Sequence, residues 1–191
     1  MGSIPFIPAN KINMIGSHNS ISYKRAIHWY QRLMKPWYQC QELSLSDQYS
    51  QGVRYFDIRV NWIDNHWHLV HNKIDFGILD ADVIQFFKRE SWVRLGYDNR
   101  STPSNVEECI TRFKILIQHL TALGWNIDSA ITFWDWKEHL TPTISVNEYH
   151  VSVSGKWYQY ILGTKWFAKK FNQEYLKTHI EGTYLLDYIN L

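Results

Sequence analysis

The chain has 191 residues, of which 45% are hydrophobic and 16% aromatic, and 20 lysines and arginines stand against 18 aspartates and glutamates, a net charge of +2. This composition excludes disordered, collagen-like and low-complexity chains, which have little apolar surface or far more glycine and proline. The near-neutral charge, without a basic run, gives no support for nucleic-acid binding, and the length predicts one domain over residues 1–191.

Short runs rich in β-branched and aromatic residues alternate with helical patterns, which predicts an α/β protein whose helices cover a mostly parallel sheet. The first predicted strand is Lys11–Ile15, and it leads into the turn Gly16–Asn19. The second is Val53–Val60. The pair Asp64-Asn65 is typical of a tight turn and could join this strand in a hairpin to a third run, His66–His71.

The clearest helix follows Ser104, which has capping-box spacing to Glu107, and Gly124 marks its end. Its apolar residues recur at steps of four and three, as one buried face of a helix requires: Val106, Ile110, Phe113, Ile117 and Leu120. The remaining predicted elements are helices over Asp80–Glu90 and Thr164–Leu176 and strands over Trp92–Leu95, Ser129–Trp136 and Thr183–Ile189.

Charged residues interrupt one face of the predicted strand Val53–Val60. Phe56 and Ile58 point to one side, suited to packing under a helix, whereas Asp57 and Arg59 lie side by side on the other. One interpretation is an inward-facing salt bridge. The other is a charged site at the carboxyl end of the strand, where α/β barrels place catalysis.

Three more titratable residues lie at the ends of predicted strands, namely His18, His71 and Asp187. A single histidine in such a place is more often structural than functional. Two histidines, two aspartates and an arginine at one edge of a sheet nevertheless suit acid–base chemistry on a phosphate ester, because that chemistry needs a base, an acid and a cation.

Three segments resemble, in order and spacing, the X-region of phosphatidylinositol-specific phospholipase C: Met14–Ser20, Gln51–Arg59 and Leu69–Asn72. The last segment, Gly182–Asn190, is similar to the final barrel strand of the bacterial enzymes, whereas the middle of the chain matches them loosely. The resemblance implies a TIM-barrel-like fold. Because a complete eightfold barrel usually takes ~250 residues, we expect a barrel that is shortened or incomplete.

The resemblance also implies catalytic roles. His18 would be the general base on the inositol 2-hydroxyl, with Asp187 fixing its tautomer, and His71 would be the acid that protonates the departing diacylglycerol oxygen. Arg59 would stabilise the charge on the phosphate, and Asp57 would orient Arg59 or His71. The implied reaction cleaves a phosphoinositide to diacylglycerol and a cyclic inositol phosphate.

The residues at the positions of the resemblance also indicate whether catalysis needs a metal ion. Eukaryotic members hold calcium with an asparagine after the first histidine and with carboxylates of the second strand, whereas bacterial members have an arginine where one of these carboxylates would be. Arg59 therefore implies catalysis without calcium or another cofactor. Asn19 is similar to the eukaryotic asparagine, while the bacterial enzymes carry an aspartate that assists the acid, so proton delivery from His71 would be weaker here.

Substrate contacts are assigned to Asn19 and, after the strand that begins at Ser129, to Asp135 and Lys137. The expected partners are a phospholipid substrate, with phosphatidylinositol as the first choice, and a membrane surface. Arg94, Tyr97 and Asp98 are either similarly placed, beside the predicted strand Trp92–Leu95, or part of an exposed loop.

The stretch Lys24–Tyr38 contains Trp29-Tyr30 and Trp37-Tyr38 among basic residues. It predicts either an amphipathic interfacial helix or a helix packed on the barrel. Two other functions remain open: a catalytically weak or inactive head-group binding protein, and a phosphodiesterase for another phospholipid.

No apolar stretch reaches the ~18 residues of a membrane-spanning helix, and no signal peptide is visible, so we expect a soluble protein, cytoplasmic or peripheral to a membrane. Cys40 and Cys109 lie in no metal-ligand spacing and are expected to be buried thiols. The oligomeric state is left open.

Overall fold

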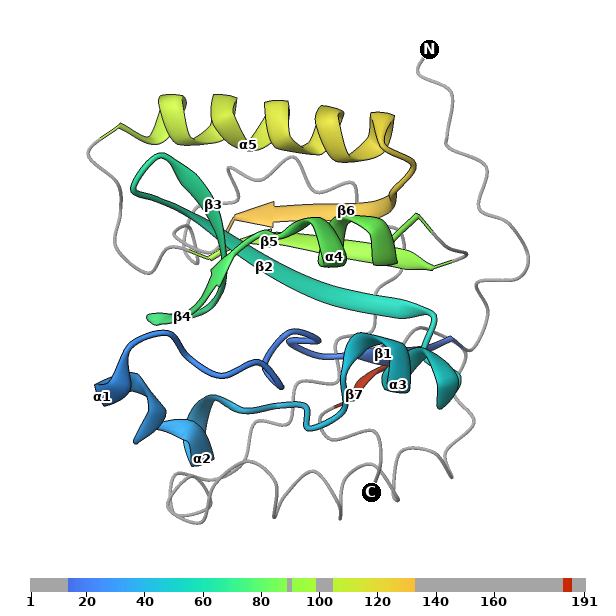
Figure 1. Ribbon diagram of the computed structural model, residues 1–191. Helices are drawn as coiled ribbons and strands as arrows, with labels where there is room; N and C mark the ends of the chain where they lie inside the picture. Colours follow the sequence, from blue (N-terminus) through green and yellow to red (C-terminus); the bar gives the residue numbers. More distant parts are fainter. Residues whose placement is uncertain (1–13, 89–90, 99–104, 133–183, 187–191) are drawn as a thin grey trace.

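The computed structural model describes residues 14–88, 91–98, 105–132 and 184–186, which form a seven-stranded sheet with helices packed against it (Figure 1). The strands are β1 (Ile15–Ser17), β2 (Tyr55–Ile63), β3 (His66–His71), β4 (Ile74–Ile78), β5 (Trp92–Tyr97), β6 (Asn126–Thr132) and β7 (Tyr184–Leu186). The helices are α1 (Trp29–Arg32), α2 (Lys35–Tyr38), α3 (Leu45–Ser50), α4 (Ala81–Phe86) and α5 (Val106–Ala122).

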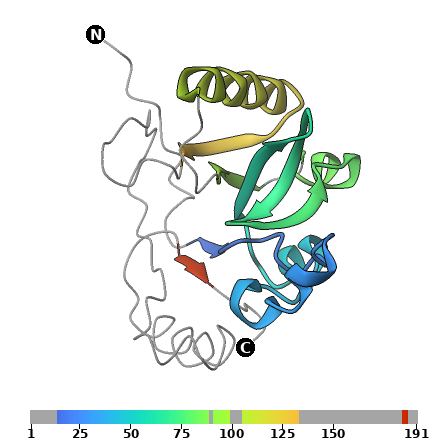
Figure 2. The same cartoon turned by 90° about the vertical axis from the view of Figure 1, so that its left-hand side faces the viewer.

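The sheet is mixed. β1 pairs in parallel with β2 and β7, and a parallel ladder also runs from β2 through β5 to β6. β3 and β4 are added as an antiparallel hairpin extension of β2. The predicted alternation of strands and helices is confirmed, and the sheet is strongly curved (Figure 2). Its closure into a barrel would involve residues outside the described ranges and, like the single-domain assignment, stays a prediction.

One edge of β2 changes its partner half-way along the strand. Tyr55 and Phe56 pair with β1, whereas Val60–Ile63 pair with β3, while β5 follows the opposite edge over Tyr55–Val60. β1 runs parallel to β2 and β3 runs against it, so the carboxyl ends of these two short partners meet beside the middle of β2. The residues that follow β1 and those that end β3 are thereby brought together.

The hydrophobic core lies on the helix-covered face of the sheet. Phe56, Ile58 and Val60 of β2 are fully buried there, as their alternation predicts, and α5 lies along β5 and β6 (Figure 1). The rings of Phe56 and Phe87 are 5.3 Å apart, and those of Phe87 and Trp125 are 4.7 Å apart. Each large apolar side chain buried in this way contributes about 1.5–3 kcal/mol. The alternate residues of β2 face the other way and carry the charged groups.

Several predicted boundaries shift. The first strand is Ile15–Ser17, so it includes the glycine and serine predicted as a turn, and residues 11–13 lie outside the described residues. The turn at Asp64-Asn65 is confirmed, with φ of 47° and 63°. Strand β4 was missed, because Asn72 reverses the chain directly after His71 with φ of 57°.

The helices and the later strands shift as well. Asn105 caps α5 in place of Ser104, since its side chain accepts a hydrogen bond from the Glu108 amide. α4 ends at Phe86, four residues before the predicted end. β6 begins three residues before Ser129, and β5 extends to Tyr97. The predicted helix over residues 164–176 lies outside the described residues.

The single helix predicted over Lys24–Tyr38 is wrong. The segment forms two helices of four residues each, α1 and α2, because Met34 leaves helical geometry with ψ of 7° and Pro36 begins a new turn. Of the two thiols, Cys40 is buried and Cys109 only partly so. No helix within the described ranges is long and apolar enough to cross a membrane.

Candidate active site

Asp57 lies at the centre of the charged face and is completely buried. Its Oδ2 atom accepts a hydrogen bond from the Asn19 amide at 3.1 Å and contacts Arg59 Nη2 at 3.1 Å, while Oδ1 lies 3.6 Å from Arg94 Nη1. Asp57 and Arg94 are direct neighbours in the β2–β5 ladder. Burial would raise the pKa of the Asp57 carboxyl, but the charges of Arg59 and Arg94 outweigh it and hold this pKa well below its usual range.

Arg59 links both sides of the site. Its Nε atom donates to Asp57 Oδ2 at 3.2 Å, Nη1 lies 3.5 Å from Asp98 Oδ2, and Nη2 donates to His18 Nε2 at 2.9 Å. Burial disfavours the guanidinium charge, but Asp57 and Asp98 more than compensate, so the pKa of Arg59 is raised. Asp98 also accepts a hydrogen bond from the Asn72 amide at 2.8 Å, which ties Arg59 to the turn after β3.

His71, the last residue of β3, is held by backbone. Its Nδ1 atom is 2.8 Å from the carbonyl oxygen of Tyr38, the last residue of α2, so Nδ1 carries a proton and Nε2 faces the site. Burial, followed by the charge of Arg59, lowers the pKa of His71 to about 3. The ring is therefore neutral near neutral pH in the unliganded protein.

His18 directly follows β1, and its side chain is 25% exposed. Its Nε2 atom accepts from Arg59 and lies 3.8 Å from Asp57 Oδ2. The ring centroids of His18 and His71 are 6.3 Å apart, with the rings nearly perpendicular. The two imidazoles thus lie close together, and one of them is hydrogen-bonded to the Arg59 guanidinium.

Asn19 fills the gap between the histidines. Its backbone has a left-handed φ of 43°, which asparagine tolerates better than most residues. The Nδ2 atom lies 3.2 Å from His18 Nε2 and 3.0 Å from His71 Nε2. The turn around it is fixed by Ser20, whose amide donates to the Asp57 carbonyl at 2.9 Å, and by Gln41, whose side chain donates to the His18 carbonyl at 3.1 Å.

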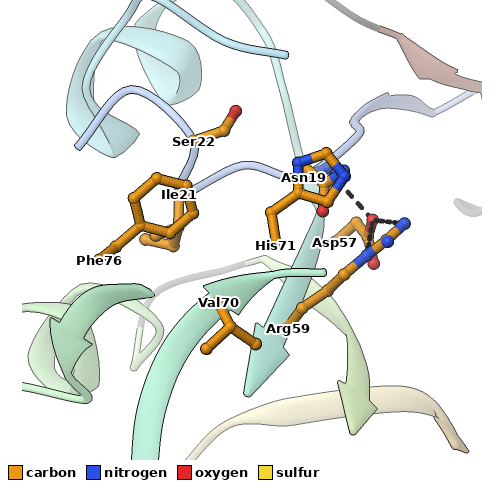
Figure 3. A pocket seen from close by; sticks show the side chains of 8 residues that line it. All are labelled: Asn19, Ile21, Ser22, Asp57, Arg59, Val70, His71 and Phe76. Atoms are coloured by element: carbon orange, nitrogen blue, oxygen red, sulfur yellow. Dashed lines mark hydrogen bonds and ion pairs between the residues drawn. The ribbon is translucent and has the colours of Figure 1, made fainter. Parts of the chain in front are cut away.

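A narrow crevice lies beside these groups (Figure 3). Asn19, Asp57, Arg59 and His71 converge at one end of it, and Ile21, Val70 and Phe76 line the apolar end. The pocket lining is: Asn19, Ile21, Ser22, Asp57, Arg59, Val70, His71 and Phe76.

The fold is similar to that of solved phospholipase C structures. A phosphatidylinositol-specific phospholipase C from Listeria monocytogenes superposes with a TM-score of 0.54 over 93% of this chain and 88% of that chain, at 17% sequence identity. The chain shares that enzyme's fold. The phospholipase C fold inferred from three sequence segments is thereby confirmed. No protein-family model matches the chain, and neither does any curated protein.

A phosphatidylinositol-specific phospholipase C from Staphylococcus aureus, studied as the N254Y/H258Y double mutant, is also similar, at 19% identity. The TM-score is 0.44, and the match covers 64% of this chain but only 47% of that one. The chain thus spans about half the length of this second phospholipase C.

Four of the predicted catalytic residues of the phospholipase C type, His18, Asp57, Arg59 and His71, lie in one cluster with Asn19. The fifth, Asp187, and the predicted substrate contacts Asp135 and Lys137 lie outside the described residues. His71 reaches the cluster at the end of an antiparallel strand that runs toward β1, and not at the carboxyl end of a strand parallel to β2, where a barrel would place it.

For Arg94, Tyr97 and Asp98 the sequence allowed either a site or an exposed loop. Tyr97 lies in neither, because it is buried in the hydrophobic core. The exposed-loop alternative is wrong, because Arg94 is 7% and Asp98 1% exposed and both are bound to the Asp57–Arg59 pair. Their spacing could have indicated a shared site. Arg94, Gly96 and Asp98 are every second residue along one strand and its end, so they lie on the same face. Throughout the described ranges, no three His, Cys, Asp or Glu side chains are grouped to hold a metal ion.

The depressed pKa of His71 predicts how stability depends on pH. Below pH ~6.5 the unfolded chain binds a proton at this histidine, and the folded chain does so only near its lowered pKa of about 3. The free energy of unfolding should therefore fall as pH drops through this window, by about 2 kcal/mol between pH 6.5 and 5 from His71 alone.

Urea denaturation of the parent and of His71→Gln across this range measures the effect. The difference between the two proteins isolates His71 from the carboxylates, which also titrate in acid. Parallel stability curves for the parent and the variant would contradict the assignment of a neutral, buried His71.

Proposed function

We propose that the protein is a phosphodiesterase of the phosphatidylinositol-specific phospholipase C type, which cleaves a phosphoinositide to diacylglycerol and a cyclic inositol phosphate. The observation that carries this proposal is the arrangement of two imidazoles, 6.3 Å apart, beside the guanidinium of Arg59. One imidazole can accept a proton and the other can deliver one, while Arg59 binds the phosphate between them.

In this reaction His18 Nε2 accepts the proton of the inositol 2-hydroxyl, whose oxygen attacks the phosphorus. The bond from phosphorus to the diacylglycerol oxygen breaks, and His71 Nε2 supplies a proton to that oxygen. Arg59 exchanges its contact with His18 for the phosphate oxygens, where its planar donors match the developing charge. The phosphate charge also offsets that of Arg59, which is the main electrostatic factor that opposes a proton on His71.

We further propose that this reaction needs no metal ion. Arg59 supplies the positive charge at the place where the phosphate would bind. The neighbouring carboxylates, Asp57 and Asp98, are already paired with arginines, so a divalent cation would have to displace a buried guanidinium to reach them. The proposed role of Asp187 in orienting His18 rests on the resemblance alone.

The proposed substrate is a lipid, and an exposed apolar surface lies close to the site. Trp29 is 71% and Trp37 46% exposed on α1 and α2, in a segment without acidic residues from Lys24 to Gln41. Other large apolar side chains exposed on the same segment are Ile27, Tyr30, Leu33 and Met34. Tryptophan among basic residues favours the interface of an anionic membrane, so we propose that this segment is the membrane-binding surface.

Replacing Trp29 or Trp37 by alanine is expected to weaken binding to phosphatidylinositol-containing vesicles by about tenfold for each substitution, because each removes a large aromatic contact with the interface. Vesicle sedimentation measures the affinity. Ile115→Ala is the control, since Ile115 is 59% exposed on α5 and lies away from this segment. Binding of both tryptophan variants at parental strength would exclude the segment as the interface.

Phosphorus NMR with phosphatidylinositol in detergent micelles, once with calcium and once with excess chelator, tests the proposed reaction. A cyclic inositol phosphate signal in both samples is the expected result. A signal with calcium alone would retain the reaction and exclude its metal-free form. No product in either sample would exclude the phosphatidylinositol reaction.

A second candidate function is a head-group binding protein without turnover. The observation that favours it is the neutral state of His71, whose pKa of about 3 leaves no proton to donate until an anion binds. Retention of vesicle binding without any product from phosphatidylinositol or other phospholipids would support this function.

A further inference from the structure

The side-chain amide of Asn19 has contacts that differ sharply between its two ends. On the nitrogen side, Nδ2 lies 3.0 Å from His71 Nε2, 3.2 Å from His18 Nε2 and 3.6 Å from Cys40 Sγ. On the oxygen side, Oδ1 is buried and has no hydrogen-bond partner among the described residues. Figure 3 shows the amide beside the His71 ring at the charged end of the pocket.

The contact between Asn19 Nδ2 and His71 Nε2 is compatible with only one protonation state of His71. Because Nδ1 of His71 donates to the Tyr38 carbonyl, a neutral His71 ring has its lone pair on Nε2, which accepts from Asn19 Nδ2. A His71 ring that carries a proton on both nitrogens would bring two donors together at this contact. The present orientation of the amide therefore matches only the neutral form of His71.

A half-turn of the amide removes this conflict. It would place Oδ1 against the Nε2–H group of a protonated His71. Nδ2 would give up its contacts with His18 Nε2 and Cys40 Sγ, whereas Oδ1 makes no hydrogen bond within the described ranges that could be lost. His18 Nε2 would keep the hydrogen bond from Arg59. An aliphatic side chain offers neither orientation, and a carboxylate offers only the acceptor.

We propose that Asn19 is a positioning residue for His71 whose amide adopts two orientations, donating to the neutral ring and accepting from the protonated one. The charged and titratable groups around His71 are Arg59 and Asp57 of β2 and His18 after β1, and Cys40, after α2, contacts the Asn19 amide. The assignment of a proton-donating step to His71 rests on the proposed function, but the two orientations do not depend on it.

NMR of protein labelled with ¹⁵N and ¹³C tests the two orientations directly. At pH 7, a coupling across the hydrogen bond should join Asn19 Nδ2 to His71 Nε2. In Arg59→Gln, which lacks the nearest opposing charge, His71 should gain its second proton at a higher pH, and the coupling should then join His71 Nε2 to the side-chain carbonyl carbon of Asn19. Adding excess inorganic phosphate to the parent protein is a second way to favour the protonated His71 ring.

Absence of the first coupling at pH 7, or a protonated His71 that is not coupled to the Asn19 carbonyl carbon, would overturn the proposal. None of these signals requires turnover, so they are independent of the failure or success of the proposed reaction.

Asn19→Asp gives a further test, because a carboxylate can only accept. It should raise the protonation constant of His71 at least tenfold and, if the protein is an enzyme, move the alkaline limb of its pH–rate profile to higher pH. Asn65→Asp is the matched control, as Asn65 also has a left-handed φ, of 63°, but lies in the exposed β2–β3 turn. An unchanged protonation constant in Asn19→Asp would contradict the contact on which the proposal depends.

Asn19→Gly covers the case in which the aspartate variant does not fold, because glycine adopts the left-handed φ of 43° without strain. If the amide serves both forms of His71, its removal should change the protonation constant by less than about threefold. A rise of tenfold or more would mean that Asn19 only donates, and would overturn the proposal.

Discussion

The His71→Ala variant is expected to cleave phosphatidylinositol about 10²–10⁴ times more slowly than the parent, the usual contribution of a positioned acid or base. His71 Nε2 faces the pocket, and Nδ1 is held by the Tyr38 carbonyl at 2.8 Å, so the ring cannot turn away without losing a buried hydrogen bond. A reaction whose leaving group needs no protonation should lose far less. Steady-state rates with the natural lipid and with a nitrophenyl phosphodiester of inositol make this comparison.

Two controls separate the role of His71 in proton transfer from a general loss of structure. His66→Ala removes an exposed histidine of the same hairpin and should leave the rate unchanged. Vesicle binding by His71→Ala should equal that of the parent. Equal loss of activity toward both substrates, or turnover at the parental rate, would exclude His71 as the acid.

Asp57→Asn is expected to lower the free energy of unfolding by about 3–5 kcal/mol, because removal of one partner leaves a buried charge uncompensated. Asp57 is completely buried and lies between the guanidiniums of Arg59 and Arg94. Asparagine has almost the same shape but no charge, so both arginines would lose their shared partner. Urea denaturation at pH 7 measures the difference.

The effect should be confined to pH values at which the carboxylate is charged. The folded pKa of Asp57 lies below its unfolded value, so this carboxylate stabilises the protein above pH ~4, and the contribution is lost in more acidic solution. Asp64→Asn, in the exposed turn, is the matched control. A loss below 1 kcal/mol in Asp57→Asn would show that the two arginines are stabilised by other groups.

The sequence predicts best those elements whose signals are local. Phe56, Ile58 and Asp57 alternate along one strand, and this pattern places the apolar and charged faces of β2 correctly. The spacing of apolar residues in α5 likewise predicts the buried residues Phe113 and Leu120. Both patterns depend only on the geometry of a single strand or helix.

Features set by tertiary contacts could not be predicted in this way. The turn at Asp64-Asn65 predicts that β3 pairs with β2, but no residue signals that β1 ends at Ser17 and leaves this edge half-way along β2. The left-handed backbone of Asn19 is stabilised by hydrogen bonds from its turn to Asp57, 38 residues away. Arg94 enters the site because β5 pairs with β2, a contact without a signature in either strand alone.

The hydrogen bond from His71 to the Tyr38 carbonyl limits how the segment that ends at Tyr38 can change in evolution. Tyr38 ends the segment that carries Trp29 and Trp37, so one peptide unit belongs both to the outer surface and to the environment of the histidine. Insertions, deletions or grafts that adapt this segment to another surface would also move the acceptor that fixes the imidazole. Changes in surface preference are thus constrained to substitutions that leave the backbone at Tyr38 in place, and chimaeras should be joined outside residues 27–40.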